Sequence, residues 1–140
     1  MRYTILTTIA AIGLLASDAV AQSNIDPVQK YAWGENVGWT NWRDADGTNA
    51  GVVVSGTFMG GFVWSENAGW INTGDGMPAN GIRYANLDGA DFGVNIDPDG
   101  TLHGFAWGEN IGWLNFDGGA MVTPAQTARI ECDGRFTGYV

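Results

Sequence analysis

Three nearly identical stretches decide the fold of this chain: YAWGENVGW at residues 31–39, FVWSENAGW at residues 62–70 and FAWGENIGW at residues 105–113. The first Trp of each stretch recurs after 31 and then 43 residues, so the length varies between the stretches and not within them. Repetition at such spacing indicates repeated structural units that are joined by loops of variable length. A residue that recurs in every copy is therefore interpreted first as part of a shared folding unit.

Each stretch is typical of a β-hairpin. Aromatic and β-branched residues flank the segment Gly/Ser-Glu-Asn-x-Gly, which provides the turn residues for a loop of about four or five residues. We expect the glycine that closes each loop to adopt a positive φ or to lie under an indole, and the asparagine to bond the loop backbone. The closing glycines are Gly38, Gly69 and Gly112.

A second, shorter hairpin precedes the aromatic one. The stretches IDPDGTLHGFA at residues 96–106 and IECDGRFTGYV at residues 130–140 align without a gap, and both contain an Asp-Gly turn signal. A shorter version occupies residues 52–60. One repeat therefore reads strand, tight turn, strand, aromatic loop, strand. We predict an all-β domain of about eight to eleven strands, in which antiparallel meander repeats form a sandwich or a barrel-like structure. A propeller-like or β-solenoid arrangement is the alternative.

The ends of the chain suggest its organisation. Residues 1–21 contain an early Arg, an apolar run and the small residues Ala-Val-Ala, which is typical of a secretory signal peptide. We expect one β-repeat domain over residues 22–140, with repeats at about 24–61, 62–104 and 105–138 and a truncated fourth. The mature chain is then secreted, either extracellular or at the cell surface, with the periplasm as an alternative. No membrane insertion is expected after cleavage.

The composition limits the partners. The sequence has 15 Asp and Glu against 6 Lys and Arg, for a formal net charge of −9, which argues against nucleic acid as a partner. Cys132 is the only cysteine, so no internal disulfide is possible and aromatic packing is expected to hold the core. A bridge between two chains through Cys132 is the alternative to an inert thiol.

The twelve repeated aromatic and polar residues of the three stretches are the candidate site. We expect them to be structural first, with the tryptophans forming a shared core. If the indoles are exposed instead, they form sugar-binding platforms beside the Glu and Asn side chains. One buried and one exposed Trp in each pair is compatible with both interpretations. The residues are Trp33, Glu35, Asn36, Trp39, Trp64, Glu66, Asn67, Trp70, Trp107, Glu109, Asn110 and Trp113.

Catalytic and metal sites find little support. The repeated glutamates have no partner carboxylate at a constant spacing, as a glycosidase would need, and the single histidine, His103, aligns with Thr137 of the next copy. The Asp-x-Asp-Gly segments at residues 44–47 and 97–100 lack the Glu of a calcium-binding EF-hand loop. We therefore expect no enzyme activity, no metal and no cofactor.

The alternation of aromatic-Ala-Trp-Gly/Ser-Glu-Asn-x-Gly-Trp-Ile/Leu-Asn with Gly-Val-x-Ile-Asp-x-Asp-Gly-x-Leu-x-Gly resembles tandem β-repeats of bacterial exported and cell-surface proteins, a family with no established activity. Trp42 and Thr73 depart from its usual Phe-like position. The resemblance implies an extracellular β-repeat protein. The expected function is a non-catalytic scaffold, adhesion or self-assembly module that contacts proteins or copies of itself through edge strands. Carbohydrate binding by a lectin-like module is the alternative.

Overall fold

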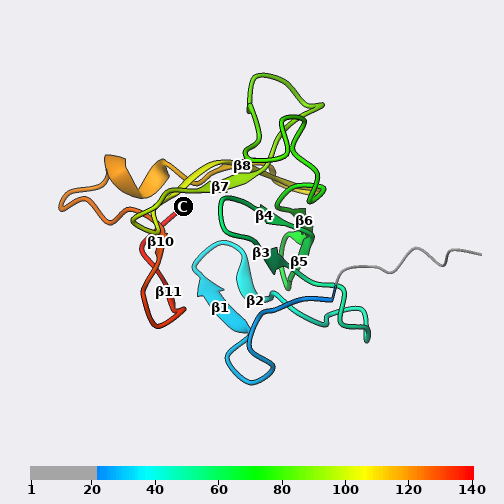
Figure 1. Ribbon diagram of the computed structural model, residues 1–140. Coiled ribbons are helices and arrows are strands. Elements are labelled where there is room, and N and C mark those ends of the chain that lie inside the picture. The colour runs from blue at the N-terminus through cyan, green and yellow to red at the C-terminus, as the bar shows by residue number, and fades with distance from the viewer. Residues whose placement is uncertain (1–21) are drawn as a thin grey trace, which may run out of the picture.

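The computed structural model describes residues 22–140 and is almost entirely β-structure (Figure 1). The predicted signal peptide, residues 1–21, lies outside the described residues. The strands are β1 (Tyr31–Gly34), β2 (Gly38–Asn41), β3 (Val53–Val54), β4 (Met59–Gly60), β5 (Phe62–Ser65), β6 (Gly69–Asn72), β7 (Val94–Ile96), β8 (Leu102–Gly108), β9 (Gly112–Asn115), β10 (Arg129–Ile130) and β11 (Phe136–Thr137). A single 3-10 turn, η1 (Gly118–Met121), is the helical part of the described chain.

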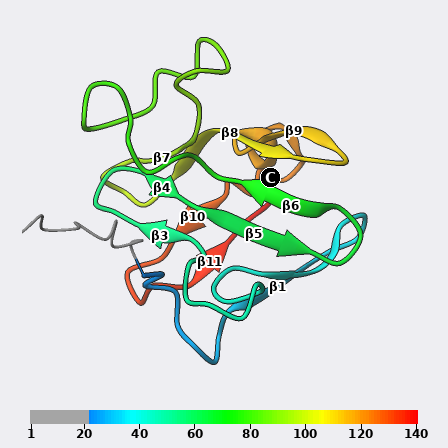
Figure 2. The same cartoon turned by 90° about the vertical axis from the view of Figure 1, so that its right-hand side faces the viewer.

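The three aromatic stretches form three antiparallel hairpins, β1–β2, β5–β6 and β8–β9, as the sequence predicts. The hairpins lie side by side in chain order, because β2 pairs with β5 and β6 pairs with β8. The resulting sheet, which β7 also joins, curls into a half-barrel (Figures 1 and 2). The predicted all-β, antiparallel, barrel-like fold is confirmed.

Short hairpins alternate with the aromatic ones. β3 pairs with β4, β7 with the first half of β8, and β10 with β11. The turn between β7 and β8 is closed by hydrogen bonds from the Gly100 N–H to the Asp97 carbonyl and from the Asp97 N–H to the Thr101 carbonyl, both 2.8 Å. The predicted meander of strand, tight turn, strand, aromatic loop and strand is present.

The core lies on the concave side of the half-barrel and is aliphatic. Successive side chains of a strand point to opposite faces of the sheet, so Val63 is buried while Trp64 is exposed, and Ala106 is buried while Trp107 is exposed. The prediction of a tryptophan-rich core is wrong. The six repeated indoles lie on the convex side, because the tightly curled concave side is filled by smaller side chains. The buried cluster consists of Ile25, Val52, Met59, Val63, Ile71, Val94, Ile96, Leu102, Ala106, Phe116 and Ala128.

The one tryptophan outside the repeated pairs behaves differently. Trp42 is half-buried against this core, and its ring centroid lies 5.4 Å from that of Phe136.

Residues 22–140 contain no helix with the length and apolar character needed to cross a membrane.

Candidate functional site

The convex face of the sheet carries three cross-strand tryptophan pairs, which together we call the outer tryptophan face. Register places the two indoles of each hairpin directly opposite one another. Their ring centroids are 5.4, 5.0 and 4.9 Å apart in the first, second and third hairpin, and each pair packs edge to face. Such packing contributes about 0.5–1.5 kcal/mol per pair beyond the area it buries. The pairs are Trp33–Trp39, Trp64–Trp70 and Trp107–Trp113.

The outer tryptophan face is open to solvent. Five of the six indoles are 40–61% exposed, and Trp70 is half-buried. Tyr31 and Phe62 add exposed rings at the starts of β1 and β5. The sequence left open whether the indoles of a pair are both buried, both exposed or one of each. In the structure both members of each pair lie on the outer side of the sheet.

The repeated Glu-Asn segments join each hairpin to the one before it, in a contact that we call the hairpin joint. The backbone N–H of Glu66 donates to the Trp39 carbonyl at 3.0 Å, and the N–H of Glu109 donates to the Trp70 carbonyl at 3.0 Å. The strand register beside these bonds is also the same in both joints: Asn41 lies opposite Trp64 in one, and Asn72 lies opposite Trp107 in the other.

The closing glycine of each loop makes room for the next hairpin. A Cβ placed on Gly38 would lie 3.0 Å from the Nδ2 atom of Asn67, and one on Gly69 would lie 2.7 Å from Nδ2 of Asn110. Both glycines have the expected positive φ, 70° and 72°. The Asn110 amide donates to the Ala68 carbonyl at 3.3 Å, so it bonds the loop of the preceding hairpin and not, as the sequence suggested, its own loop.

The predicted glutamates lie in a row at the loop ends of the three hairpins. Glu35, Glu66 and Glu109 are all exposed. The Glu66 carboxylate also accepts a long hydrogen bond, 3.4 Å, from the Trp39 N–H. The structure thus brings the twelve predicted residues together along one edge and one face of the sheet. At the hairpin joints it is the backbone N–H groups of Glu66 and Glu109 that bond the preceding hairpin.

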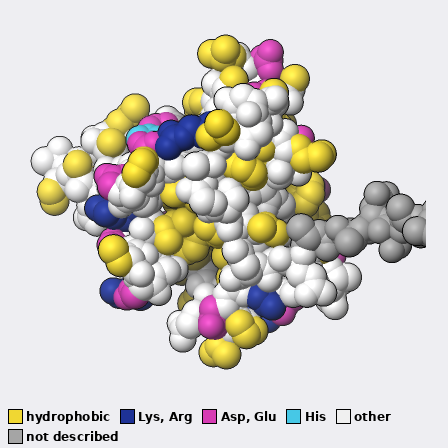
Figure 3. Space-filling view, in the orientation of Figure 1, with side chains coloured by type: hydrophobic (Ala, Val, Ile, Leu, Met, Phe, Trp, Pro, Cys, Tyr) yellow, Lys and Arg dark blue, Asp and Glu magenta, His cyan; other side chains and the backbone are white. Residues whose placement is uncertain are grey.

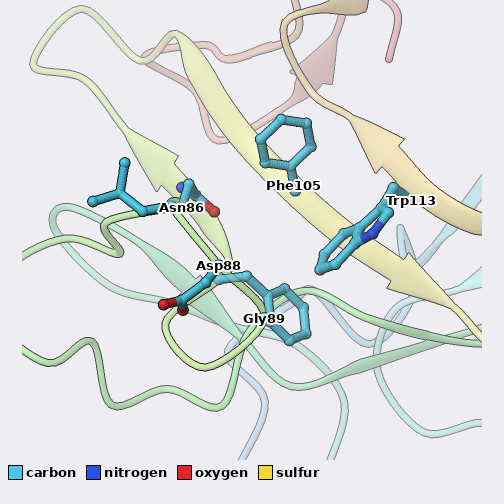
Figure 4. Close-up of a pocket in the computed structure, with 7 residues that line it drawn as sticks. Asn86, Asp88, Gly89, Phe105 and Trp113 are labelled. Atoms are coloured by element: carbon cyan, nitrogen blue, oxygen red, sulfur yellow. The ribbon is translucent and has the colours of Figure 1, made fainter.

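A trough beside the third tryptophan pair was not predicted (Figure 4). Its volume is about 440 Å³, and its aromatic side is formed by Trp113, Phe92 and Phe105. The ring centroids of Phe92 and Phe105 lie 5.0 and 6.0 Å from that of Trp113. Asn86, Leu87, Asp88 and Gly89 line the rest. These four residues belong to a loop that the longer spacing of 43 residues between Trp64 and Trp107 accommodates, and this spacing is the one sequence signal that could have found the trough.

The loop is held firmly against the sheet. The N–H of Tyr84 donates to Oδ1 of Asn95, and Nδ2 of Asn95 donates back to the Tyr84 carbonyl, both at 2.9 Å. The Tyr84 hydroxyl accepts a 2.7 Å hydrogen bond from the Gly76 N–H, and burial raises the pKa of this tyrosine to about 12. The ring packs directly on Gly93, where a Cβ would lie 2.3 Å from it.

His103 forms an ionic cluster that the sequence did not indicate. Its Nδ1 lies 2.6 Å from Oδ1 of Asp117, and its Nε2 lies 2.8 Å from Oδ2 of Asp97. Asp97 also pairs with Arg83 at 2.6 Å. The hydrogen bond to Asp117, and next the charges of both aspartates, raise the pKa of His103, while the bond from Arg83 is the main cause of the lowered pKa of Asp97. Carboxylates beside both ring nitrogens favour the imidazolium form, because only imidazolium donates twice.

The Asp-x-Asp-Gly segments serve as turns. Asp44 pairs with Lys30 at 2.6 Å, and Asp99 accepts a 3.0 Å hydrogen bond from the Thr101 N–H. The hydrogen bonds of these carboxylates lower the pKa of both aspartates. Within residues 22–140, no three His, Cys, Asp or Glu side chains are grouped so that they could hold a metal ion. Cys132 is exposed.

Comparison of the chain with protein-family models, with curated proteins and with solved structures gave no match.

Proposed function

We propose that this chain is a non-catalytic, exported β-repeat module of a cell-surface or extracellular protein, with a scaffold or adhesion role, and that the outer tryptophan face is its contact surface. The observation that supports this proposal is the exposure of 40–61% for five of the six repeated indoles, which are the largest apolar side chains of the repeats. Contiguous exposed aromatic side chains on a rigid sheet mark a surface that binds another molecule.

The use of the repeated polar residues supports a scaffold over an enzyme. The backbone amides of Glu66 and Glu109 bind the preceding hairpin, and Asn67 and Asn110 fill the space over its closing glycine. Two of the three copies of this acid, Glu66 and Glu109, therefore lie at the two joints between the three hairpins. A general acid would need one carboxylate in an environment different from the others.

The test is adhesion of beads that carry residues 22–140 to bare polystyrene, to immobilised copies of the same chain and to immobilised glycans. The triple variant Trp33→Ser, Trp64→Ser, Trp113→Ser is expected to lose most of the adhesion, because it removes one exposed indole from each pair. The matched control is Val28→Ser with Met121→Ser, which removes side chains that are 76% and 79% exposed elsewhere on the surface. Equal adhesion of the triple variant, the control and the unmodified chain would show that the tryptophan face is not the contact surface.

Carbohydrate binding is the second candidate, and the trough beside Trp113 is the observation that favours it. An indole stacks on the C–H face of a sugar ring, while amide and carboxylate oxygens such as those of Asn86 and Asp88 accept bonds from hydroxyl groups. The volume of about 440 Å³ lies within the range of small-molecule sites. The net charge of −9 favours neutral over anionic sugars.

A glycan array together with intrinsic tryptophan fluorescence separates the two candidates. Carbohydrate binding predicts a saturable spectral change with defined neutral sugars that disappears in Trp113→Ala and remains in Trp64→Ala, since Trp64 lines neither the trough nor the interior cavity. Adhesion without any response to sugars would favour the protein-contact role.

A further inference from the structure

We infer that the gap that residues 22–140 leave between β1 and β9 accepts a single β-hairpin of the same Trp-Gly/Ser-Glu-Asn-x-Gly-Trp-x-Asn type, added as a separate polypeptide. The inference deepens the proposed scaffold role and rests on it for the expectation that the chain works with protein partners. The two strands concerned are the open edges of the half-barrel: among residues 22–140, β1 pairs with β2 alone and β9 pairs with β8 alone.

Each open edge carries one half of a hairpin joint. The carbonyl of Trp113 is the equivalent of the Trp39 and Trp70 carbonyls, which both accept a glutamate N–H from the next hairpin. Within the described chain the Trp113 carbonyl has no such donor. Gly112 likewise has the positive φ of the other closing glycines, 77°. A Cβ placed on Gly112 would meet only the Trp107 ring, at 4.0 Å, whereas one on Gly69 would lie 2.7 Å from Asn110 of the next hairpin.

The other edge carries the complementary half. The Glu35 N–H is the equivalent of the Glu66 and Glu109 donors, and it has no carbonyl acceptor among residues 22–140. The repeated register therefore specifies how a fourth hairpin would dock. Its glutamate N–H would donate to the Trp113 carbonyl, with its first Trp opposite Asn115. Its second Trp carbonyl would accept from Glu35, with its Asn opposite Trp33.

The side chains behind the gap suit such an occupant. The interior of the half-barrel contains an apolar cavity of about 220 Å³. Ala32 and Val37 line it on the side of β1, and Leu114 lines it on the side of β9. The C-terminal segment also lines it, through Phe136, Thr137, Gly138 and Val140. Figure 3 shows hydrophobic side chains in the hollow at the centre of this face. In the three hairpins present, the residue between the second Trp and Asn faces inward (Thr40, Ile71 and Leu114), so an added hairpin would place one more such residue over the cavity.

The occupant must be a hairpin because both edges offer backbone groups. A small apolar molecule could fill the cavity but would leave the Trp113 carbonyl and the Glu35 N–H without partners. Three hairpins contribute six strands, and a fourth would bring the total to about eight, the number at which side chains fill the interior of a small closed barrel.

The probe for the test is a synthetic peptide with the sequence of residues 107–115, WGENIGWLN, added to residues 22–140, because Tyr139 and Val140 already stand where Phe105 and Ala106 would lie. We expect saturable binding by calorimetry, a higher melting temperature, and amide chemical-shift changes at Glu35 and Trp113 in NMR spectra. The same peptide methylated on the glutamate backbone nitrogen carries a methyl group in place of the joint donor, and should bind at least about fivefold to tenfold more weakly.

Two protein variants on the same strand provide the matched control. Ala32→Asp places a charge at the mouth of the cavity and should abolish peptide binding, whereas Tyr31→Asp changes the adjacent exposed residue and should retain it. Circular dichroism establishes that both variants are folded. A folded chain that binds no peptide, shift changes confined to the outer tryptophan face, or equal binding of the methylated peptide would each overturn the inference. Bead adhesion that survives Ala32→Asp separates failure of this inference from failure of the proposed function, because the tryptophan face is unchanged in that variant.

Discussion

The two faces of strand β8 differ in a way that reverses the usual ranking of apolar side chains. Leu102 and Ala106 point into the half-barrel and are at most 2% exposed, whereas Trp107 points outward from the same strand and is 42% exposed. The concave face holds the smaller residues in close packing, and the convex face displays the larger ones. The difference teaches that the hairpins are held together mainly from the inside and leave their most apolar side chains available for contact with other molecules.

The largest effect should come from the concave face. Leu102→Ala is expected to lower the free energy of unfolding by about 3 kcal/mol, because it leaves a cavity in a close-packed site. Urea unfolding followed by fluorescence measures this change. A loss smaller than that of an outer tryptophan would contradict the contrast between the faces.

The second-largest loss of stability should arise at the hairpin joint, where one hairpin contacts the one before it. Gly69→Ala combines an unfavourable backbone at φ 72° with a Cβ that would lie 2.7 Å from Asn110, and should cost about 2–3 kcal/mol. Gly112→Ala is the matched control, because φ is 77° but no neighbouring hairpin lies within reach, and should cost about 1 kcal/mol. Equal costs in denaturant unfolding would mean that the joint contributes nothing beyond backbone strain.

A smaller effect is expected on the convex face. Trp107→Ala removes the edge-to-face contact with Trp113 and part of the buried area, and should cost about 1–2 kcal/mol. The variant is compared with Leu102→Ala in the same urea series, and the double variant should be close to additive because the two side chains lie on opposite faces. A cost near that of Leu102→Ala would show that the outer face also acts as a core.

The sequence predicted the elements better than their orientation. The repeated Trp-x5-Trp spacing indicated hairpins, and the loop glycines indicated positive φ, since both properties depend on neighbours along the chain. The alternation around Trp64 defines two faces of a strand but does not say which one is inward. Hydrophobicity favoured the indole, whereas the curvature of the sheet, a property of the whole fold, selected Val63.

Polar contacts between residues far apart in the chain also could not be predicted from the sequence. The Asn95 side chain accepts a hydrogen bond from the Tyr84 N–H on the other side of a loop. His103 lies within hydrogen-bond distance of Asp117 only because β8 and β9 are paired. Nothing in the local pattern around these residues specifies such partners. The role of Glu66 and Glu109 at the joints was likewise hidden, because it depends on how one hairpin lies against the next.

The smallest effect should come from the ionic cluster of His103 on the convex side of β8. The neighbouring carboxylates of Asp117 and Asp97 raise the folded-state pKa of His103 above its ordinary value of 6.5, so the charged form contributes stability. This contribution is fully present below pH 6.5 and is lost as the pH rises through the raised folded-state pKa. The pKa of Asp97 is lowered, and that of Tyr84 is about 12, so neither group titrates in this range.

We therefore expect the melting temperature to fall between about pH 6 and pH 8.5, by an amount equivalent to less than about 1 kcal/mol, since the imidazole is 38% exposed and its ion pairs are screened. His103→Gln keeps a polar side chain of similar size without the titration, and its melting temperature should be lower than that of the unmodified chain at pH 6 and close to it at pH 8.5. Calorimetry of both chains in 0.1 M and 1 M salt measures the difference, which should shrink at high salt. A melting temperature of the unmodified chain that rises across this range, while that of His103→Gln does not, would reverse the sign of the linkage and show that the neutral imidazole is the form that the fold prefers.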